Sequence, residues 1–245
     1  MINTVPAITR CMITIIGTGH VFNISEQIMF FVKQIWPQAV LVELDGARLN
    51  AMEASGNKDA EKSEQPELPW IYRSTAKYQE RMSKRYGTRT GNELLTAVQT
   101  GRLVGAEIGM IDMDVIKLTN DMWKEMSFWE KTRYTFSTYF DRFGGKRRVE
   151  KAVDNLTENQ DRTIEAMRRK YPTLVRKLID ERNEYMVDKI IPYADRLDNI
   201  VVVVGDFHVE GIAKGLEGRE IRKIRLGDIL NKESLDRLKD EVWNR

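Results

Sequence analysis

The feature that most constrains this chain is a short pattern that occurs once near each end. Near the carboxyl end, Ile200–Val204 is a run of β-branched residues that leads into Gly-Asp-Phe-His, ending at His208. Near the amino end, Met12–Ile16 leads into Gly-Thr-Gly-His, ending at His20. Each segment is typical of a fully buried strand followed by Gly-x-x-His. The chain has two histidines, so the pattern presents both imidazoles at the carboxyl ends of predicted strands.

The composition limits the kinds of molecule that this chain is expected to bind and the compartment in which it is expected to lie. The chain has 39 Lys and Arg against 37 Asp and Glu, interspersed, with a net charge of +2, which gives no reason to expect a nucleic-acid partner. The single cysteine, Cys11, excludes an intrachain disulfide framework and fits a reducing compartment. The sequence shows no signal-peptide pattern and no apolar run long enough to span a bilayer. We therefore expect a cytoplasmic protein without a membrane segment.

Predicted strands alternate with predicted helices along the chain. The sequence predicts further strands at Ala39–Leu44, Glu107–Met113 and Glu220–Leu226. It predicts helices at Glu26–Trp36 with Ser25 as N-cap, Asp45–Met52, Arg73–Tyr86, Gly91–Val104 opened by a capping box from Thr90 to Glu93, Val209–Leu216 and Glu233–Trp243. This alternation indicates an α/β fold with a mostly parallel central sheet flanked by helices.

Residues 115–193 interrupt the alternation, because they are almost wholly helical in pattern. We expect breaks in the helices at Gly144, Pro172 and Pro192. The prediction is one α/β domain over residues 1–245, with a helical insertion at about 115–193. Six aromatic residues of the insertion fall close together: Phe128, Trp129, Tyr134, Phe136, Tyr139 and Phe140. Core packing or a subunit contact, and hence a homodimer, is the favoured interpretation, and a lid over a substrate cleft is the alternative.

Four polar side chains lie at or just after the carboxyl ends of the predicted strands, which is where ligands bind to parallel sheets. His20 and His208 follow the first and fourth strands, and Glu43 and Asp112 lie at the ends of the second and third. Because the carboxyl ends of parallel strands share one edge of the sheet, we expect these side chains to converge there. The glycines before the histidines allow tight turns and close approach of a substrate or ion.

Two imidazoles and a carboxylate make a workable catalytic site for a divalent ion with open positions for water and substrate. Such an ion lowers the pKa of bound water and polarises a carbonyl. Each residue alone also has a structural explanation: a histidine after a strand is usually a satisfied hydrogen-bonding group, and Glu43 or Asp112 could cap a following helix. The repeated Gly-x-x-His pattern favours the site for the histidines.

The chain resembles the TraB family, which includes a bacterial pheromone-shutdown protein and, more distantly, the Tiki membrane proteases. The resemblance covers nearly the whole chain, in order. The matching segments are Gly17-Thr18-Gly19-His20-Val21 with Ser25, Val42-Glu43-Leu44-Asp45 with Arg48, Gly91-x-Glu93, Ile111-Asp112-x-Asp114, Glu181-Arg182-Asn183 with Met186, and Val204-Gly205-Asp206-Phe207-His208-Val209-x-Gly211-Ile212. The chain departs from the family where Met113 replaces an expected arginine and Asp121 an expected basic residue.

The resemblance implies a fold similar to that of the erythromycin esterase and ChaN-like group. For the Tiki branch it implies a metal-dependent peptidase that uses the two histidines and a glutamate. His20, His208 and Glu43 then become candidate metal ligands or acid/base groups, and Arg182 becomes a candidate contact for an oxyanion or a substrate carboxylate. The two departures remove positive charge, so they count against a substrate anion bound from that loop.

We therefore predict a metal-dependent hydrolase of peptides or other amides or esters. His20, His208, Glu43 and Asp112 are the candidate ligands for manganese, cobalt or zinc, and Glu43 or Asp112 is the candidate base. One alternative is a metal-independent, esterase-like hydrolase with a histidine as general base. Another is a protein that binds and sequesters a peptide, as in pheromone shutdown, without turnover.

Overall fold

The computed structural model describes residues 11–19, 22–56, 91–141 and 160–243. Its strands are β1 (Met12–Thr18), β2 (Ala39–Val42), β3 (Glu107–Met110), β4 (Asn199–Gly205) and β5 (Glu220–Ile224). Its α-helices are α1 (Ser25–Ile35), α2 (Gly46–Gly56), α4 (Asn92–Leu103), α5 (Val115–Glu125), α6 (Phe128–Asp141), α8 (Gln160–Lys170), α9 (Pro172–Val175), α10 (Glu181–Ala194), α11 (Val209–Gly215), α12 (Leu226–Leu230) and α13 (Lys232–Trp243). A π-helical turn, Arg176–Asp180, precedes α10, and a 3₁₀ turn, Asp206–His208, follows β4.

The five strands form one parallel sheet in the order β3-β2-β4-β1-β5, as the alternation of strands and helices predicts. Strand β4 lies at its centre, between β1 and β2. The register pairs Thr18 with Gly205, so the two strands that precede the histidines end side by side. The sheet therefore places the backbones of the two strands that lead into the Gly-x-x-His segments side by side, although these strands are far apart in the sequence.

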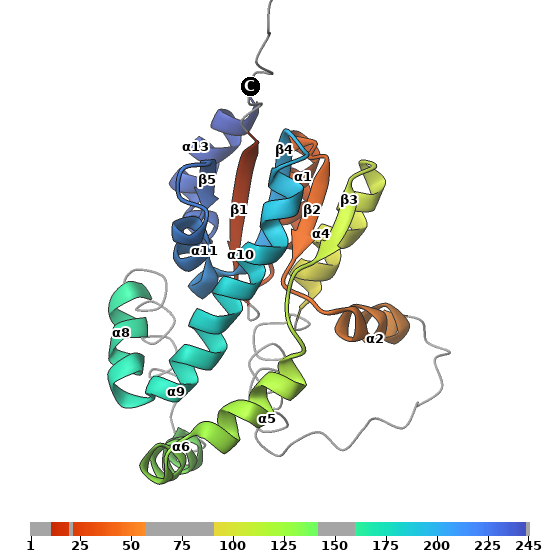
Figure 1. Ribbon diagram of the computed structural model, residues 1–245. Coiled ribbons are helices and arrows are strands. Elements are labelled where there is room, and N and C mark those ends of the chain that lie inside the picture. The colour runs from red at the N-terminus through yellow and green to blue at the C-terminus, as the bar shows by residue number, and fades with distance from the viewer. Residues whose placement is uncertain (1–10, 20–21, 57–90, 142–159, 244–245) are drawn as a thin grey trace, which may run out of the picture.

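Helices cover both faces of the sheet (Figure 1). On one face, α1, α4, α12 and α13 pack on alternate strand residues such as Ile16 and Val203. On the other face, α10 and α11 pack on the intervening residues, among them Ile15 and Val202. Because β-branched residues on both sides of β4 are fully buried, the valine run has no polar face, as a central parallel strand requires.

The helical insertion follows β3 and extends beyond the carboxyl ends of the strands (Figure 1). Part of it has a small core of its own, formed by Met122, Met126, Tyr171, Leu174 and Val175. The aromatic segment divides within α6: the ring of Tyr134 packs edge-on against that of Tyr171, whereas Phe128 and Trp129 are more than 70% exposed. The lid and the homodimer stay predictions.

Several predicted element boundaries shift in the structure. The strands predicted to end at Leu44, Met113 and Leu226 stop earlier in the structure. Glu43 therefore follows β2 directly, and Asp112 lies two residues beyond the end of β3. Ile24, not Ser25, is the N-cap of α1, because the Ser25 hydroxyl accepts a hydrogen bond from Asn92 Nδ2 at 2.8 Å instead.

The predicted capping box of α4 stays a prediction, because Thr90 lies outside the described residues; among the described residues Gly91, with φ +80°, is the N-cap of this helix. One further local prediction is wrong. Pro192 lies inside α10, in its last turn, rather than ending it; the proline removes one intrahelical hydrogen bond, to the carbonyl four residues earlier, and the helix still continues to Ala194. Pro172, by contrast, opens α9, where its ring is favoured.

The predicted helix at Arg73–Tyr86 and the break at Gly144 lie outside the described residues. Within the part of the chain that the structure describes, no helix is both long and apolar enough to cross a membrane.

Candidate functional site

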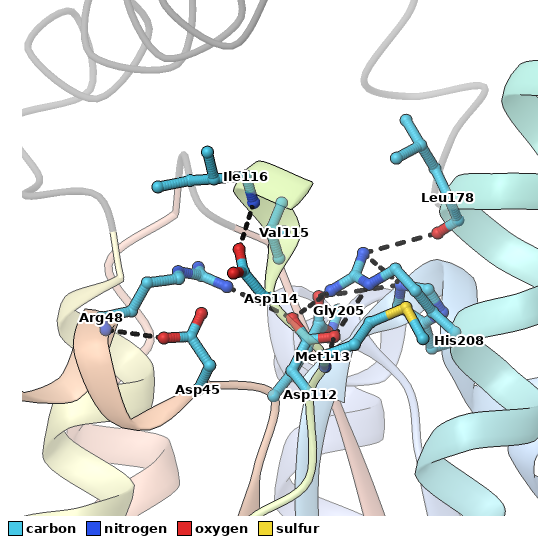
Figure 2. A network of polar contacts seen from close by, with 12 residues as sticks. Asp45, Arg48, Asp112, Met113, Asp114, Val115, Ile116, Leu178, Gly205 and His208 are labelled. Carbon is cyan, nitrogen blue, oxygen red and sulfur yellow. Dashed lines mark hydrogen bonds and ion pairs between the residues drawn. The ribbon is translucent and has the colours of Figure 1, made fainter. Parts of the chain in front are cut away.

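Four predicted site residues are placed by the structure, and all four converge at the carboxyl edge of the sheet. Glu43 follows β2, Asp112 follows β3, His208 ends the turn after β4, and Arg182 reaches the edge from the first turn of α10. All four are at least 91% buried. Figure 2 shows part of this polar network, with Asp112 between Arg48 on one side and His208 on the other.

The guanidinium of Arg182 is the centre of the network. Its Nε donates to Asp112 Oδ1 at 2.9 Å, and its Nη2 donates to Asp112 Oδ2 at 2.7 Å and to Glu43 Oε1. Its Nη1 lies 3.1 Å from His208 Nε2 and 3.4 Å from the Leu178 carbonyl. An arginine side chain has five N–H groups, and these contacts account for all five. Arg182 has no donor left for an oxyanion or a substrate carboxylate unless it gives up a present partner.

The π-helical turn before α10 contributes to this arrangement. Leu178 belongs to that turn, and its carbonyl accepts from Arg182 four residues later. The side chain of Arg182 is thus held from its own helix as well as from the strand ends.

Both ring nitrogens of His208 have a neighbour. Its Nδ1 lies 2.7 Å from Asn183 Oδ1, and its Nε2 faces the N–H of Arg182. Since the guanidinium can only donate, Nε2 carries the lone pair and Nδ1–H donates to Asn183, which assigns the neutral tautomer. Glu43 Oε1 lies 3.7 Å from the same Nε2. The imidazole is therefore oriented with its basic nitrogen toward Arg182 and Glu43.

At this edge the space beside two glycines is filled by side chains of the protein itself. From the sequence we expected a substrate or ion to approach the backbone at such glycines. Gly205 has an ordinary φ of −57°; its N–H donates to Glu43 Oε2 at 2.5 Å, and a Cβ there would lie 3.2 Å from the same oxygen. A Cβ on Gly211 would collide with the Asn183 amide. At both positions a side chain of the candidate site packs directly against the backbone, and glycine leaves room for it.

Asp112 is the most enclosed carboxylate of the site, with a side chain that is 0% exposed. Arg48, on α2, donates from Nη1 to Asp112 Oδ2 at 3.3 Å, and the backbone N–H of Arg48 donates to Asp45 Oδ1 at 2.8 Å. Burial raises the pKa of Asp112 above its ordinary value, against the opposing effect of the Arg182 and Arg48 guanidinium groups. Burial alone would lower the pKa of Arg182, but Glu43 and Asp112 together raise it, so Arg182 stays charged.

The described residues, as they stand, do not fit a metal ion. In the part of the chain that the structure describes, no three His, Cys, Asp or Glu side chains are grouped to hold one. The physical reason is that the Arg182 guanidinium lies among Glu43, Asp112 and His208 and donates to each of them. Two arginines already balance the two carboxylates, so a divalent ion would meet positive charge rather than open ligands.

His20 lies outside the described residues, so its role stays a prediction. No role was predicted for Asn183 or Arg48, although both stand in segments that match the TraB pattern. A signal for Asn183 was present: it directly follows Arg182 at the start of a helix. Nothing local in the sequence marks Arg48 as a partner of Asp112, which is 64 positions away.

Comparisons with known proteins identify relatives of this chain. The model of the TraB/PrgY/gumN family matches residues 8–220. An uncharacterized protein of Methanocaldococcus jannaschii is 24% identical over 219 residues, which are 87% of this chain and 55% of that protein. The chain thus spans about half the length of this relative.

Proposed function

Because the chain belongs to the TraB/PrgY/gumN family, we propose that it is a hydrolase of peptides or other amides or esters that uses His208 as a general base at the arginine-centred edge of the sheet. The observation that carries this proposal is the orientation of His208, with Nδ1–H on Asn183 and Nε2 toward Arg182 and Glu43. A base held by a second group, with its lone pair at the site, is the arrangement that water activation needs.

In this reaction water attacks the substrate carbonyl and gives one proton to His208 Nε2. The carbon–nitrogen or carbon–oxygen bond then breaks, and the imidazolium returns the proton to the leaving amine or alcohol. The nearby carboxylate of Glu43, 3.7 Å from Nε2, stabilises the transient imidazolium. Water reaches Nε2 by displacing one contact of Arg182 Nη1, while its other four contacts hold the guanidinium in place.

Arg48 is the better candidate for a substrate anion than Arg182, the residue first expected in that role. The side chain of Arg48 is 30% exposed, and Asp112 is the single partner that the structure gives it among the described residues. Its remaining N–H groups can donate to a carboxylate or to a carbonyl oxygen. We therefore assign substrate contact to Arg48 and the neutralisation of buried carboxylates to Arg182.

Metal-dependent hydrolysis, the first prediction from sequence, is the second candidate, because three of its four predicted ligands, Glu43, Asp112 and His208, lie at one edge of the sheet, although Arg182 now occupies the space between them. Manganese, cobalt or zinc bound there would supply a Lewis acid and activate water. Binding would require Arg182 to leave, with His20 as a further ligand. A peptide-binding role without turnover would use the same residues and differ only in leaving the substrate intact.

The experiment is hydrolysis of a mixed library of short peptides and esters, followed by mass spectrometry, with native protein dialysed against chelator. We expect cleavage by this protein and a loss of at least about 100-fold in His208→Ala, the scale of a general base. Intact library with native protein contradicts the hydrolase and leaves the binding role. Cleavage only after addition of Mn²⁺, Co²⁺ or Zn²⁺ contradicts the metal-independent form.

The matched controls are variants that keep the fold. Asn183→Asp retains an acceptor for Nδ1–H, so it should keep more activity than Asn183→Leu, which removes the acceptor. Arg48→Lys should retain part of the affinity for an anionic substrate and Arg48→Met should lose it, with the rate at saturating substrate less affected. Equal losses in both members of either pair would contradict the assigned role.

A further inference from the structure

A second buried polar cluster lies at the same edge, on the other side of β4, and the proposed reaction does not use it. Its centre is Asp206, the first residue of the turn that ends at His208, and it is 95% buried. The partners are Gln160 at the start of α8, and Arg225 and Leu226 at the junction of β5 and α12.

The carboxylate of Asp206 accepts hydrogen bonds on both oxygens. Oδ1 accepts from Leu226 N at 2.9 Å and from Arg225 Nε at 3.0 Å, and Oδ2 accepts from Gln160 Nε2 and from Arg225 Nη2 at 3.2 Å. The Gln160 carbonyl oxygen accepts in turn from Arg225 Nη2. Four N–H groups donate to one carboxylate, two to each oxygen. A carboxylate satisfies all four because both of its oxygens accept, whereas an amide has a single acceptor oxygen.

The backbone of β1 leaves room for this carboxylate. A Cβ on Gly17 would collide with Asp206 Oδ1, far inside van der Waals contact. Gly17 is the glycine of the amino-terminal Gly-x-x-His segment, and Asp206 lies within the carboxyl-terminal one. The two segments therefore interlock: the glycine of one accommodates the aspartate of the other, between neighbouring parallel strands.

From this geometry we propose that Asp206 is a positioning residue for His208 and that, through Gln160, it fastens the helical insertion to the turn that carries His208. The proposal deepens the proposed function, on which it rests for the role of His208. Asp206 is fixed at one end of a three-residue turn and His208 at the other, so loosening of Asp206 frees the imidazole from its contacts with Asn183 and Arg182. Gln160 makes α8 part of the same rigid unit.

The test uses the ¹⁵N-labelled full chain and needs no substrate. Long-range ¹H–¹⁵N spectra of the imidazoles report the tautomer, and a His208→Ala spectrum assigns the signals, because the chain has two histidines. In native protein we expect His208 as a single neutral tautomer with Nδ1 protonated. In Asp206→Asn the amide NH₂ meets N–H donors, so we expect mixed tautomers and faster amide exchange of Phe207–Val209, by about tenfold, as for a lost hydrogen bond to a charged group.

Glu210→Gln is the matched control. Glu210 also binds Arg225, at 2.7 Å, but its side chain is 41% exposed and it does not contact Asp206 in the described network. We expect its His208 spectrum to equal that of native protein. A folded Asp206→Asn variant with native His208 signals and exchange overturns the proposal, and so does an equal change in Glu210→Gln.

Gln160→Ala keeps the proposal testable if Asp206→Asn does not fold. This variant removes one donor to Asp206 and leaves the carboxylate in place. We expect faster exchange in the first turn of α8 together with a smaller, two- to fivefold increase for Phe207–Val209. Faster exchange confined to α8 overturns the link between the insertion and the His208 turn. Neither measurement depends on catalysis, so both can be interpreted even if the protein does not hydrolyse the proposed substrates.

Discussion

The two polar clusters at the carboxyl edge of the sheet are built alike but differ in what their arginine holds. Each contains a guanidinium that pairs with two carboxylates: Arg182 with Glu43 and Asp112, and Arg225 with Asp206 and Glu210. The Arg182 cluster also holds an imidazole, whereas the Arg225 cluster holds the amide of Gln160. Buried charge pairing is therefore common to both clusters, and what sets the Arg182 cluster apart is the imidazole on which the proposed function rests.

Burial also separates the clusters. The side chain of Arg182 is 10% exposed and that of Arg225 is 24% exposed, so the carboxylates around Arg182 depend more on their arginine. Breaking a buried pair costs more than breaking an exposed one, because the remaining charge loses both its partner and its water.

The largest effect is expected for Arg182→Ala. The substitution leaves Glu43 and Asp112 buried without their main cation, so the free energy of unfolding should fall by about 3–5 kcal/mol. Urea denaturation measures the change. Arg196→Ala is the control: its pair with Glu107 is nearly half exposed on both sides, so it should lose less than about 1 kcal/mol. Similar losses in the two variants would contradict the central place of Arg182.

A smaller effect is expected for Gly17→Ala, which places a methyl group against Asp206. The cost of forcing a group into this packed position should be about 1–3 kcal/mol, measured in the same way. Gly46→Ala is the matched control, because the nearest atom to a Cβ there is Met110 Sδ at 3.9 Å, so it should be neutral or slightly stabilising. A neutral Gly17→Ala would show that Asp206 does not rely on the space beside β1.

The smallest effect concerns the pH dependence that Asp112 contributes. Because burial raises the pKa of Asp112 in the folded state, the folded chain binds its proton more tightly than the unfolded chain does. The resulting stability is fully present below the unfolded pKa, about 3.9, and is lost as pH rises through the folded pKa. The free energy of unfolding of native protein, minus that of Asp112→Asn, should therefore fall as pH rises from about 4.

Equilibrium denaturation at a series of pH values measures this difference. A difference that rises with pH would mean that Arg182 and Arg48 outweigh burial and lower the pKa of Asp112. That result would support the electrostatic role of Arg182. The sign of the pH dependence therefore shows whether burial or ion pairing dominates the pKa of Asp112.

The sheet was predictable from sequence because apolar strands buried on both faces leave an unambiguous pattern, as Ile200–Val204 does. The convergence of Glu43, Asp112 and His208 followed from the same pattern, since parallel strands align their carboxyl ends. The contacts of Arg182 did not follow, because it lies on a helix 139 positions from Glu43, and helical periodicity does not say which strand end a side chain reaches.

The glycines show where the same reasoning goes wrong. A glycine beside a histidine indicates close approach, but the sequence does not say what approaches. In the structure Gly17, Gly205 and Gly211 face side chains of the protein itself, namely Asp206, Glu43 and Asn183. The local prediction of Ser25 as N-cap failed for a similar reason: its hydroxyl serves a tertiary contact with Asn92.

The Arg182 guanidinium is the cation that neutralises the buried carboxylates at this edge of the sheet. This assignment is tested by calorimetric titration of Mn²⁺, Co²⁺ and Zn²⁺ into chelator-treated native protein and into Arg182→Ala. We expect no stoichiometric binding to native protein, and binding of one ion to Arg182→Ala, which frees Glu43, Asp112 and His208. One ion bound by native protein, and lost in Glu43→Gln, would contradict this assignment.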